Sequence, residues 1–179
     1  STISFGVGTV CLIILNLIIN PQMLAPSFLT HQDINYHWFI GGLLGVCFLT
    51  GNLLLLPRLG AALTVVITVA GQIIMGVTID TLGLFGANEQ SFTLFKAVGI
   101  VLLLIGILLM NQIPKDKLMG KSNSRLYIWL IVGFIFGCAP PIQTTINSAL
   151  AKEVDSSFFA SLVSFTIGTI ALLILTLIF

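Results

Sequence analysis

Uncharged polar side chains gather in one short stretch of an otherwise apolar sequence, CAPPIQTTINSAL at residues 138–150. Gln143 and Asn147 are four residues apart, so a helix would place both amides on one face, with Thr144 and Ser148 forming a neighbouring polar stripe. Polar side chains within a membrane tend to face the bundle interior or a water-filled cavity. The spacing therefore predicts a site that binds a small molecule through hydrogen bonds.

Two prolines, Pro140 and Pro141, precede this face. Each removes a backbone N–H donor and obstructs the preceding helical turn, which frees carbonyl groups for a ligand, a water molecule or a neighbouring helix. Broken helices near the membrane midplane are a recurrent way to build a transport site. The alternative is that the prolines only bend the helix and the amides hold helices together, through hydrogen bonds of about 0.6 kcal/mol each.

Two further amides lie on neighbouring apolar stretches, Asn52 in LTGNLLLLPRLG and Gln72 in TVAGQIIMG. Gln72 is nearer the middle of its stretch and follows Gly71, which would allow close approach of a substrate or of another backbone. We expect Asn52 and Gln72 to contribute to the same binding site. Helix packing through these amides is equally compatible with the pattern.

Two charged residues at the ends of apolar stretches are candidates for ion coupling or gating. Asp80 could bind a proton or an ion, although a solvated helix end, where the carboxylate stays hydrated, is the simpler explanation. Arg58, in the turn LPRLG, could bind an anionic substrate, and a marker of the cytoplasmic side is again the simpler explanation.

Enzymatic, metal-binding and nucleic-acid-binding functions find no support in the residue pattern. The sequence has no HExxH or GxSxG motif and no paired carboxylates inside an apolar stretch, and its only histidines are His31 and His37. Its three cysteines are widely spaced inside apolar runs and predict neither disulfides nor a metal site. A net charge of +1 leaves no basic face for nucleic acid. We therefore expect a protein without enzymatic activity, cofactor or metal.

The elements that hold the polar residues must be membrane helices. Hydrophobic residues make up 57% of the chain and charged residues only 7%, against about a quarter charged in soluble domains. The apolar stretches are continuous rather than alternating, which favours helices over a β-barrel, because each helix satisfies its own backbone hydrogen bonds in lipid. Six stretches are long enough to cross the hydrocarbon core. They comprise residues 1–19, 38–56, 60–79, 94–110, 126–150 and 156–179.

The beginning of the chain is repeated at its end. STISFGVGTVCLIILNLII at residues 1–19 and SLVSFTIGTIALLILTLIF at residues 161–179 are identical at 10 of 19 positions. Because the last stretch is the fifth after the first, equivalent helices would cross the membrane in opposite directions, as in transporters with inverted repeats. The identities that hydrophobicity alone does not explain are Ser1 with Ser161, Ser4 with Ser164, Phe5 with Phe165, Gly8 with Gly168 and Thr9 with Thr169.

The repeat predicts an all-α, polytopic helical bundle made of two inverted five-helix repeats. The complete protein would have about ten spans, of which this chain holds six. Residues 1–111 would supply the last four helices of the first repeat, and residues 112–125 a basic cytoplasmic linker. Residues 126–179 would supply the first two helices of the second repeat.

The basic residues set the expected orientation. Under the positive-inside rule, five would face the cytoplasm and two the outside. Tyr127 and Trp129 would anchor the cytoplasmic interface. The five inner residues are Arg58, Lys115, Lys117, Lys121 and Arg125, and the two outer residues are Lys96 and Lys152.

Glycine pairs four residues apart predict close helix packing. They are Gly41 with Gly45 and Gly133 with Gly137, the small-xxx-small pattern of membrane helices.

The partners that we expect are the lipid bilayer and a small-molecule substrate, and not nucleic acid. The sequence leaves open whether the protein forms a homodimer.

Three strings occur in an order that points to one family: LPRLGAALTVVITVAGQ, DTLGLFG and PPIQTTINSALAKEVDSSFFASLVSFTIGT. Together they resemble the YdcZ-like family of the drug/metabolite transporter superfamily, the EamA-like inner-membrane exporters, with Ile142 where that family usually has leucine. The resemblance implies a multi-pass exporter of the cell membrane, the inner membrane in a bacterium, with an inverted-repeat fold, and it supplies no substrate. The family elements fall on Arg58, Gly60, Gln72, Asp80, Pro141, Gln143, Asn147, Ser164, Phe165, Gly168 and Thr169.

These patterns predict a secondary transporter that exports a small metabolite by alternating access. Gln143, Asn147 and Gln72 would line its cavity, with Thr144 and Asn52 beside them. Without a buried carboxylate the chain is a poor match to a proton-coupled antiporter of cationic drugs, so a neutral or zwitterionic solute fits better. The alternative is a membrane assembly or scaffold subunit that transports nothing, which the glycine-rich faces would also suit.

Overall fold

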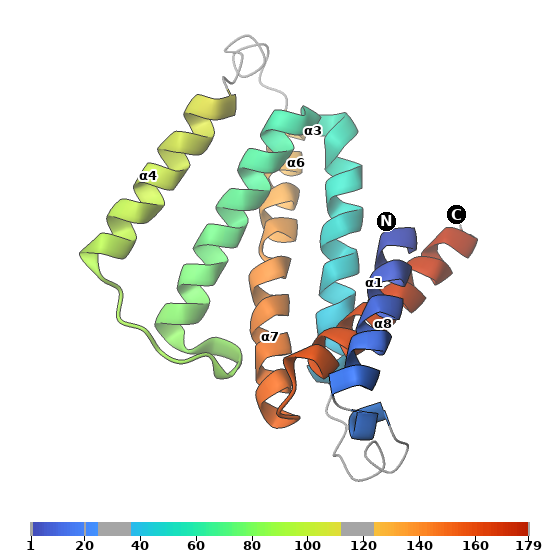
Figure 1. The fold of residues 1–179 in the computed structure, drawn as a ribbon. Coiled ribbons are helices and arrows are strands. Elements are labelled where there is room, and N and C mark those ends of the chain that lie inside the picture. Colours follow the sequence, from blue (N-terminus) through green and yellow to red (C-terminus); the bar gives the residue numbers. More distant parts are fainter. Residues whose placement is uncertain (1, 20, 25–36, 112–123, 179) are drawn as a thin grey trace. The chain divides into compact units, whose positions relative to one another are not determined.

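A computed structural model describes residues 2–19, 21–24, 37–111 and 124–178. Every element of these residues is helical, and four helical segments are long and apolar enough to cross a membrane, namely Thr2–Ile19, Phe39–Leu82, Leu126–Glu153 and Ser157–Ile178. The predicted class, an all-α membrane protein, is therefore confirmed. The elements are α1 (Thr2–Ile19), η1 (Pro21–Leu24), α3 (His37–Leu82), η2 (Leu84–Gly86), α4 (Leu94–Asn111), α6 (Ser124–Gly137), α7 (Ala139–Glu153) and α8 (Ser157–Ile178) (Figure 1).

Helix α3 joins the second and third predicted stretches in one element of 46 residues. The chain bends at Gly60, whose φ of 78° and ψ of 167° lie outside the helical range and favour glycine. From this bend the two legs of α3 run in opposite directions (Figure 1). The predicted helix end at Leu56 was wrong, because the helix continues through Pro57 to the bend. A proline removes one backbone hydrogen bond, which membrane helices tolerate.

The predicted break before the two prolines is present. Helix α6 ends at Gly137, Cys138 lies in a turn, and α7 begins at Ala139. Pro140 and Pro141 therefore lie in the first turn of α7, where N–H groups have no partner within the helix and proline is tolerated. The stretch 126–150 thus forms two helices rather than one, and the second continues past the predicted end to Glu153.

A compact turn joins α7 to α8. The N–H of Ser156 donates to the carbonyl oxygen of Ala151 at 3.0 Å, and Asp155 has a left-handed φ of 53°, as at the C-terminus of a helix closed by a Schellman motif. The Oγ of Ser156 accepts the N–H of Phe159 at 3.2 Å and so caps α8. Beneath this turn lies a buried hydrophobic cluster of Leu150, Val154, Phe159 and Ala160.

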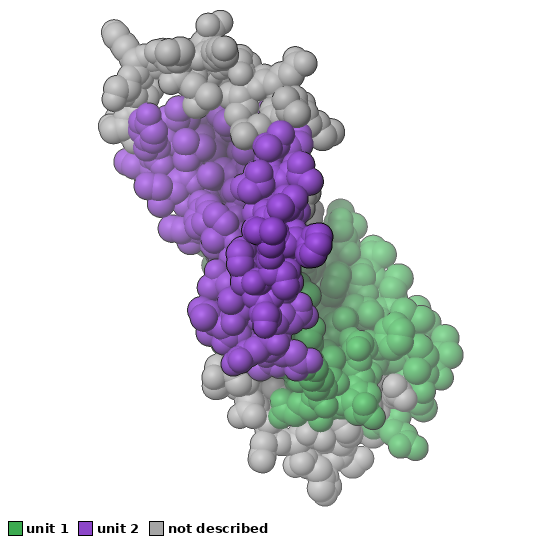
Figure 2. Space-filling view, turned by 90° about the vertical axis from the view of Figure 1, so that its left-hand side faces the viewer, with its two compact units in different colours: residues 1–46, 142–179 green, residues 47–141 purple. Residues whose placement is uncertain are grey.

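The chain divides into two compact units, which are coloured separately in Figure 2. Unit 1 comprises Ser1–Val46 and Ile142–Phe179, and unit 2 comprises Cys47–Pro141. The predicted basic linker falls mostly on residues 112–123, which lie outside the described residues. The predicted division into repeats therefore stays a prediction.

Within unit 1, α1 and α8 contact each other through residues that are equivalent in the predicted repeat. The Oγ1 atoms of Thr9 and Thr169 are 3.0 Å apart and share a hydrogen bond. The rings of Phe5 and Phe165 are stacked, with 5.0 Å between their centroids. The two helices cross with the first and last described residues at the same end of the pair (Figure 1).

The surrounding contacts are reciprocal. A β-carbon added to Gly8 would lie 2.6 Å from the ring of Phe165, and one added to Gly168 would lie 2.5 Å from the ring of Phe5. Each glycine thus makes room for the phenylalanine of the equivalent helix. Two elements related by a two-fold axis make contacts of this kind, in which residue i meets j and j meets i.

The stacked rings permit a test of this crossing. Phe5→Leu and Phe165→Leu are each expected to destabilise the protein by similar amounts, and a double-mutant cycle should give a coupling of about 1 kcal/mol, because each change removes the same ring pair. Unfolding in detergent measures these differences. Phe5→Leu combined with Phe95→Leu, an exposed ring of unit 2, should instead be additive. Additivity in the Phe5 and Phe165 cycle would contradict the stacking.

Candidate functional site

In unit 1, the amides of α7 lie against two glycines of α3. A β-carbon added to Gly45 would be 2.9 Å from the Nε2 of Gln143, and one added to Gly41 would contact the Oδ1 of Asn147. The two glycines are one helical turn apart on α3, and the two amides are one turn apart on α7, so the pairs align. Because glycine has no side chain, each amide occupies the space that a side chain of α3 would otherwise fill. We call this the amide face.

The two amides differ in their hydrogen bonds. The Nδ2 of Asn147 donates to the Oγ of Ser164 on α8 at 3.2 Å, and Ser164 is buried. The side chain of Gln143 is partly buried, and its amide has no hydrogen-bond partner among the residues that the structure describes. The Gln143 amide is therefore free to bind a ligand or a water molecule.

The neighbouring polar stripe lies on an exposed side of α7. Thr144 and Ser148 are both exposed, and the Oγ of Ser148 donates to the carbonyl oxygen of Thr144 at 2.9 Å, within the same helix. The predicted spacing is thus present, but the Ser148 hydroxyl bonds to its own helix. Any contact of Thr144 with a substrate stays a prediction.

Asn52 and Gln72 lie on the two legs of α3 within unit 2. The Nδ2 of Asn52 donates to the carbonyl oxygen of Phe48, one turn earlier, at 3.1 Å. The amide of Gln72 is partly buried and has no hydrogen-bond partner in the described part of the chain. The structure thus brings Gln143 and Asn147 together on the amide face. That Gln72 and Asn52 converge on the same cavity stays a prediction.

Glycines have a different role where α6 packs on the second leg of α3, in unit 2. A β-carbon added to Gly137 would lie 2.8 Å from the Cα of Thr68, and one added to Gly71 would lie 3.1 Å from the Cα of Gly137. Backbone here approaches backbone, as the small-xxx-small pattern predicts. The Sγ of Cys138 also points to the carbonyl oxygen of Gly71, at 3.8 Å. Gly71 and Gly137 thus serve helix packing, whereas Gly41 and Gly45 accommodate amides.

The two charged candidates lie exposed in unit 2. The guanidinium carbon of Arg58 is 5.2 Å from the ring centroid of Trp129, within range of a cation–π interaction. Asp80 is in the last turn of α3, and its carbonyl oxygen accepts the N–H of Gln90 at 2.8 Å. Both positions suit the simpler, helix-end explanation. Roles of Asp80 and Arg58 in coupling or gating stay predictions.

Sequence reasoning missed Asn16, which is completely buried in α1. Its Nδ2 donates to the carbonyl oxygens of Leu12 at 2.8 Å and of Phe158 at 3.1 Å, and thereby ties α1 to the start of α8. Its Oδ1 is buried without a hydrogen-bond partner among the described residues. The signal was present, because Asn16 is the only amide side chain in the stretch 1–19 and an amide in lipid seeks a partner.

Comparison with known proteins identifies a family. A family model described as "Putative inner membrane exporter, YdcZ" matches residues 1–109 and 128–179. Comparisons with curated proteins and with solved structures gave no match. The matched ranges contain the amide face, both legs of α3 and the crossing of α1 with α8, and together they cover most of the chain. The chain therefore belongs to the YdcZ family of inner-membrane exporters, which are multi-pass proteins of the cell membrane.

Proposed function

We propose that this protein is a secondary transporter that exports a small neutral or zwitterionic metabolite, and that the solute binds at the amide face. The observation that carries this proposal is the amide of Gln143, which is partly buried beside Gly45 and has no hydrogen-bond partner among the described residues. A solute with hydrogen-bonding groups would satisfy both the donor and the acceptor of this amide. An uncharged amide suits a neutral or zwitterionic solute better than an ion.

The mechanism that we propose is alternating access between two inverted five-helix repeats. Its support is the crossing of α1 with α8, where Thr9 meets Thr169 and Phe5 meets Phe165. Equivalent residues that meet in this way fit two repeats related by a pseudo-two-fold axis, and rocking of one repeat against the other is the usual way in which such folds alternate access. We assign six crossings, namely α1, the two legs of α3, α4, α6 with α7, and α8.

The orientation that we propose places the bend of α3 and the start of α6 at the cytoplasmic interface. The contact of Arg58 with the ring of Trp129 supports it, because arginine and tryptophan both favour the boundary between lipid and water. The turn between α7 and α8 would then face the outside. The proposal assigns no catalytic step and no cofactor to the chain, and its partners are lipid and the transported solute.

A scaffold subunit that transports nothing is the second candidate, and one observation favours it. The amide of Asn147 already bonds to Ser164 across two helices of unit 1. This is the type of interhelical hydrogen bond that holds membrane helices together. The role of Asn147 in packing is therefore measured by stability, and its role in binding is measured separately by transport.

Isosteric replacements test the site. Gln143→Met keeps the length of the side chain and removes the amide, so transport by the full-length protein in proteoliposomes should fall about tenfold while the unfolding temperature stays unchanged. Asn147→Leu should reduce both transport and stability, because its bond to Ser164 is lost. Thr78→Val is the control, since the exposed Thr78 hydroxyl bonds, among the described residues, only to the carbonyl oxygen of Ile74 in its own helix.

The solute for this assay comes from a thermal-shift screen of the full-length protein against a metabolite library, because a ligand of the native state raises its apparent stability. Unchanged transport of such a solute by Gln143→Met would exclude the amide face as the site. Cysteines placed along α7 can be labelled from each side of the membrane. If no solute is transported and this labelling does not change with conditions, the scaffold function is the correct one.

A further inference from the structure

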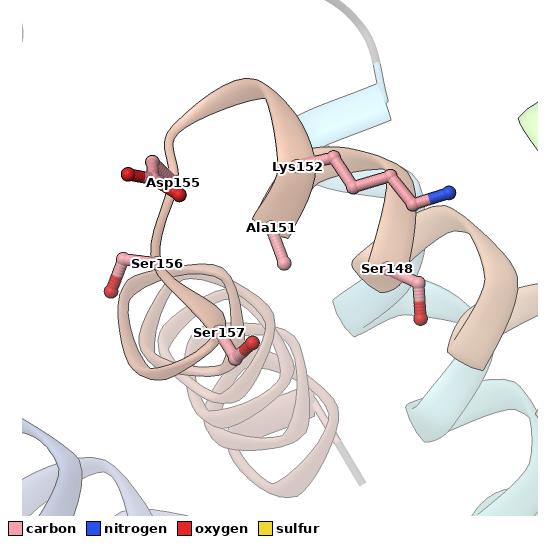
Figure 3. A pocket seen from close by; sticks show the side chains of 6 residues that line it. All are labelled: Ser148, Ala151, Lys152, Asp155, Ser156 and Ser157. Carbon is pink, nitrogen blue, oxygen red and sulfur yellow. The ribbon is translucent and has the colours of Figure 1, made fainter.

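A cavity of about 370 Å³ opens at the turn between α7 and α8, within unit 1. It shares no residue with the amide face. Figure 3 shows its lining, which is polar at every position but one. The lining residues are Ser148, Ala151 and Lys152 from α7, Asp155 and Ser156 from the turn, and Ser157 from α8.

Both signs of charge border this cavity. Lys152 and Asp155 are exposed, and no ion pair joins them within the described residues. In Figure 3 they lie on opposite sides of the view, with Ala151 and Ser157 between them. Glu153, the last residue of α7, is exposed nearby but does not line the cavity. One carboxylate and one ammonium in the lining favour a ligand that carries a cation and an anion together.

The start of α8 adds donors for the anionic end. Ser156 caps the N–H of Phe159, and the first N–H groups of a helix otherwise have no partner within it. Together with the helix dipole they favour a phosphate or a carboxylate. The hydroxyl of Ser157 and the ammonium of Lys152 border the same cavity.

The position of the cavity identifies the source of its ligand. Leu126–Glu153 and Ser157–Ile178 are both candidate membrane spans. The turn between them therefore lies where the chain leaves the hydrocarbon core, at the level of the lipid headgroups. Phe158, which follows Ser157, is 43% exposed and could contact an acyl chain beside the cavity.

We propose that this cavity binds the headgroup of a zwitterionic phospholipid with a primary ammonium, of the phosphatidylethanolamine type. The phosphate contacts Lys152, Ser157 and the first N–H groups of α8, and the ammonium donates to Asp155. A choline headgroup carries the same charges, but its methylated nitrogen cannot donate a hydrogen bond to a carboxylate. A phosphatidylglycerol headgroup is anionic and carries no ammonium that could donate a hydrogen bond to Asp155. This lipid site is independent of the export site on the amide face.

Native mass spectrometry of the delipidated full-length protein tests the proposal. The probes are phosphatidylethanolamine, phosphatidylcholine and phosphatidylglycerol with identical acyl chains, and soluble glycerophosphoethanolamine. We expect the ethanolamine lipid to bind most tightly, and Lys152→Gln and Asp155→Asn each to weaken its binding about two- to fivefold. Asparagine tolerates the left-handed conformation at position 155, so the fold should persist. Lys96→Gln is the control, because Lys96 lies in unit 2, outside the cavity, and its ammonium donates to the Oε1 of Gln90 at 2.9 Å.

The same variants should lose the rise in unfolding temperature that the ethanolamine lipid causes, which gives a second readout. Binding that is equal for all three lipids, or unchanged in both cavity variants, would overturn the proposal. Glycerophosphoethanolamine binding as tightly as the lipid would replace the lipid site with a site for a soluble solute.

Discussion

Gly137→Ala is expected to destabilise the protein by about 3 kcal/mol or more. The new methyl group would meet the backbone of Thr68, with the nearest carbon at 2.8 Å. A backbone cannot turn aside as a side chain can, so α6 and the second leg of α3 would have to separate within unit 2. The close approach at Gly71 would be lost with it.

The matched control for this prediction is Gly76→Ala, which lies on the same leg of α3 as Thr68. A β-carbon at Gly76 meets no heavy atom within 4 Å among the described residues. Alanine is about 1 kcal/mol more favourable than glycine in a helix, so Gly76→Ala should leave stability unchanged or raise it. Unfolding in detergent measures both variants, and equal stability of the two would contradict the contact between backbones.

Gly45→Ala is expected to lower transport about tenfold while changing the unfolding free energy by less than about 1 kcal/mol. Its β-carbon would lie 2.9 Å from the Nε2 and 3.2 Å from the Oε1 of Gln143. These atoms are the far end of a flexible side chain, so the amide can rotate away at little cost to folding. Its position for binding the solute would be lost.

Gly42→Ala gives the contrasting result on the same helix, because its β-carbon would lie 2.5 Å from the backbone oxygen of Ser164. Stability should therefore fall. Gly6→Ala, with no heavy atom within 4 Å in the described chain, should change neither stability nor transport. Efflux from proteoliposomes and thermal unfolding, measured on all three variants, separate these outcomes. In addition, Gly45→Ala and Gln143→Met should not be additive in transport, since both act on one amide. Full activity of Gly45→Ala would contradict the role of Gln143.

Local patterns predicted the helical framework of the amide face. The four-residue spacing of Gln143 and Asn147 predicted one helical face, and Pro140 with Pro141 predicted the break that is present at Cys138. Both follow from the geometry of a single helix. The same reasoning erred at Leu56, because one proline does not end a membrane helix and the bend depends on Gly60.

The partners of these residues could not be predicted in this way. Nothing in the spacing of Asn147 indicates that Ser164 accepts its hydrogen bond, or that Asn16 ties α1 to the carbonyl of Phe158. The amide of Gln143 also looks no different in sequence from that of Asn147, yet only Asn147 has a hydrogen-bond partner in the described part of the chain.

The amino-acid sequence by itself determined that this protein is a helical membrane protein of an exporter family and that residues 1–19 are repeated at 161–179. These properties depend on burial in lipid and on hydrogen bonds between near neighbours along the chain. Tertiary structure alone decided that Gly45 leaves room for an amide and Gly137 for a backbone. The same four-residue glycine spacing serves both purposes, because the role of a glycine depends on which distant helix packs against it.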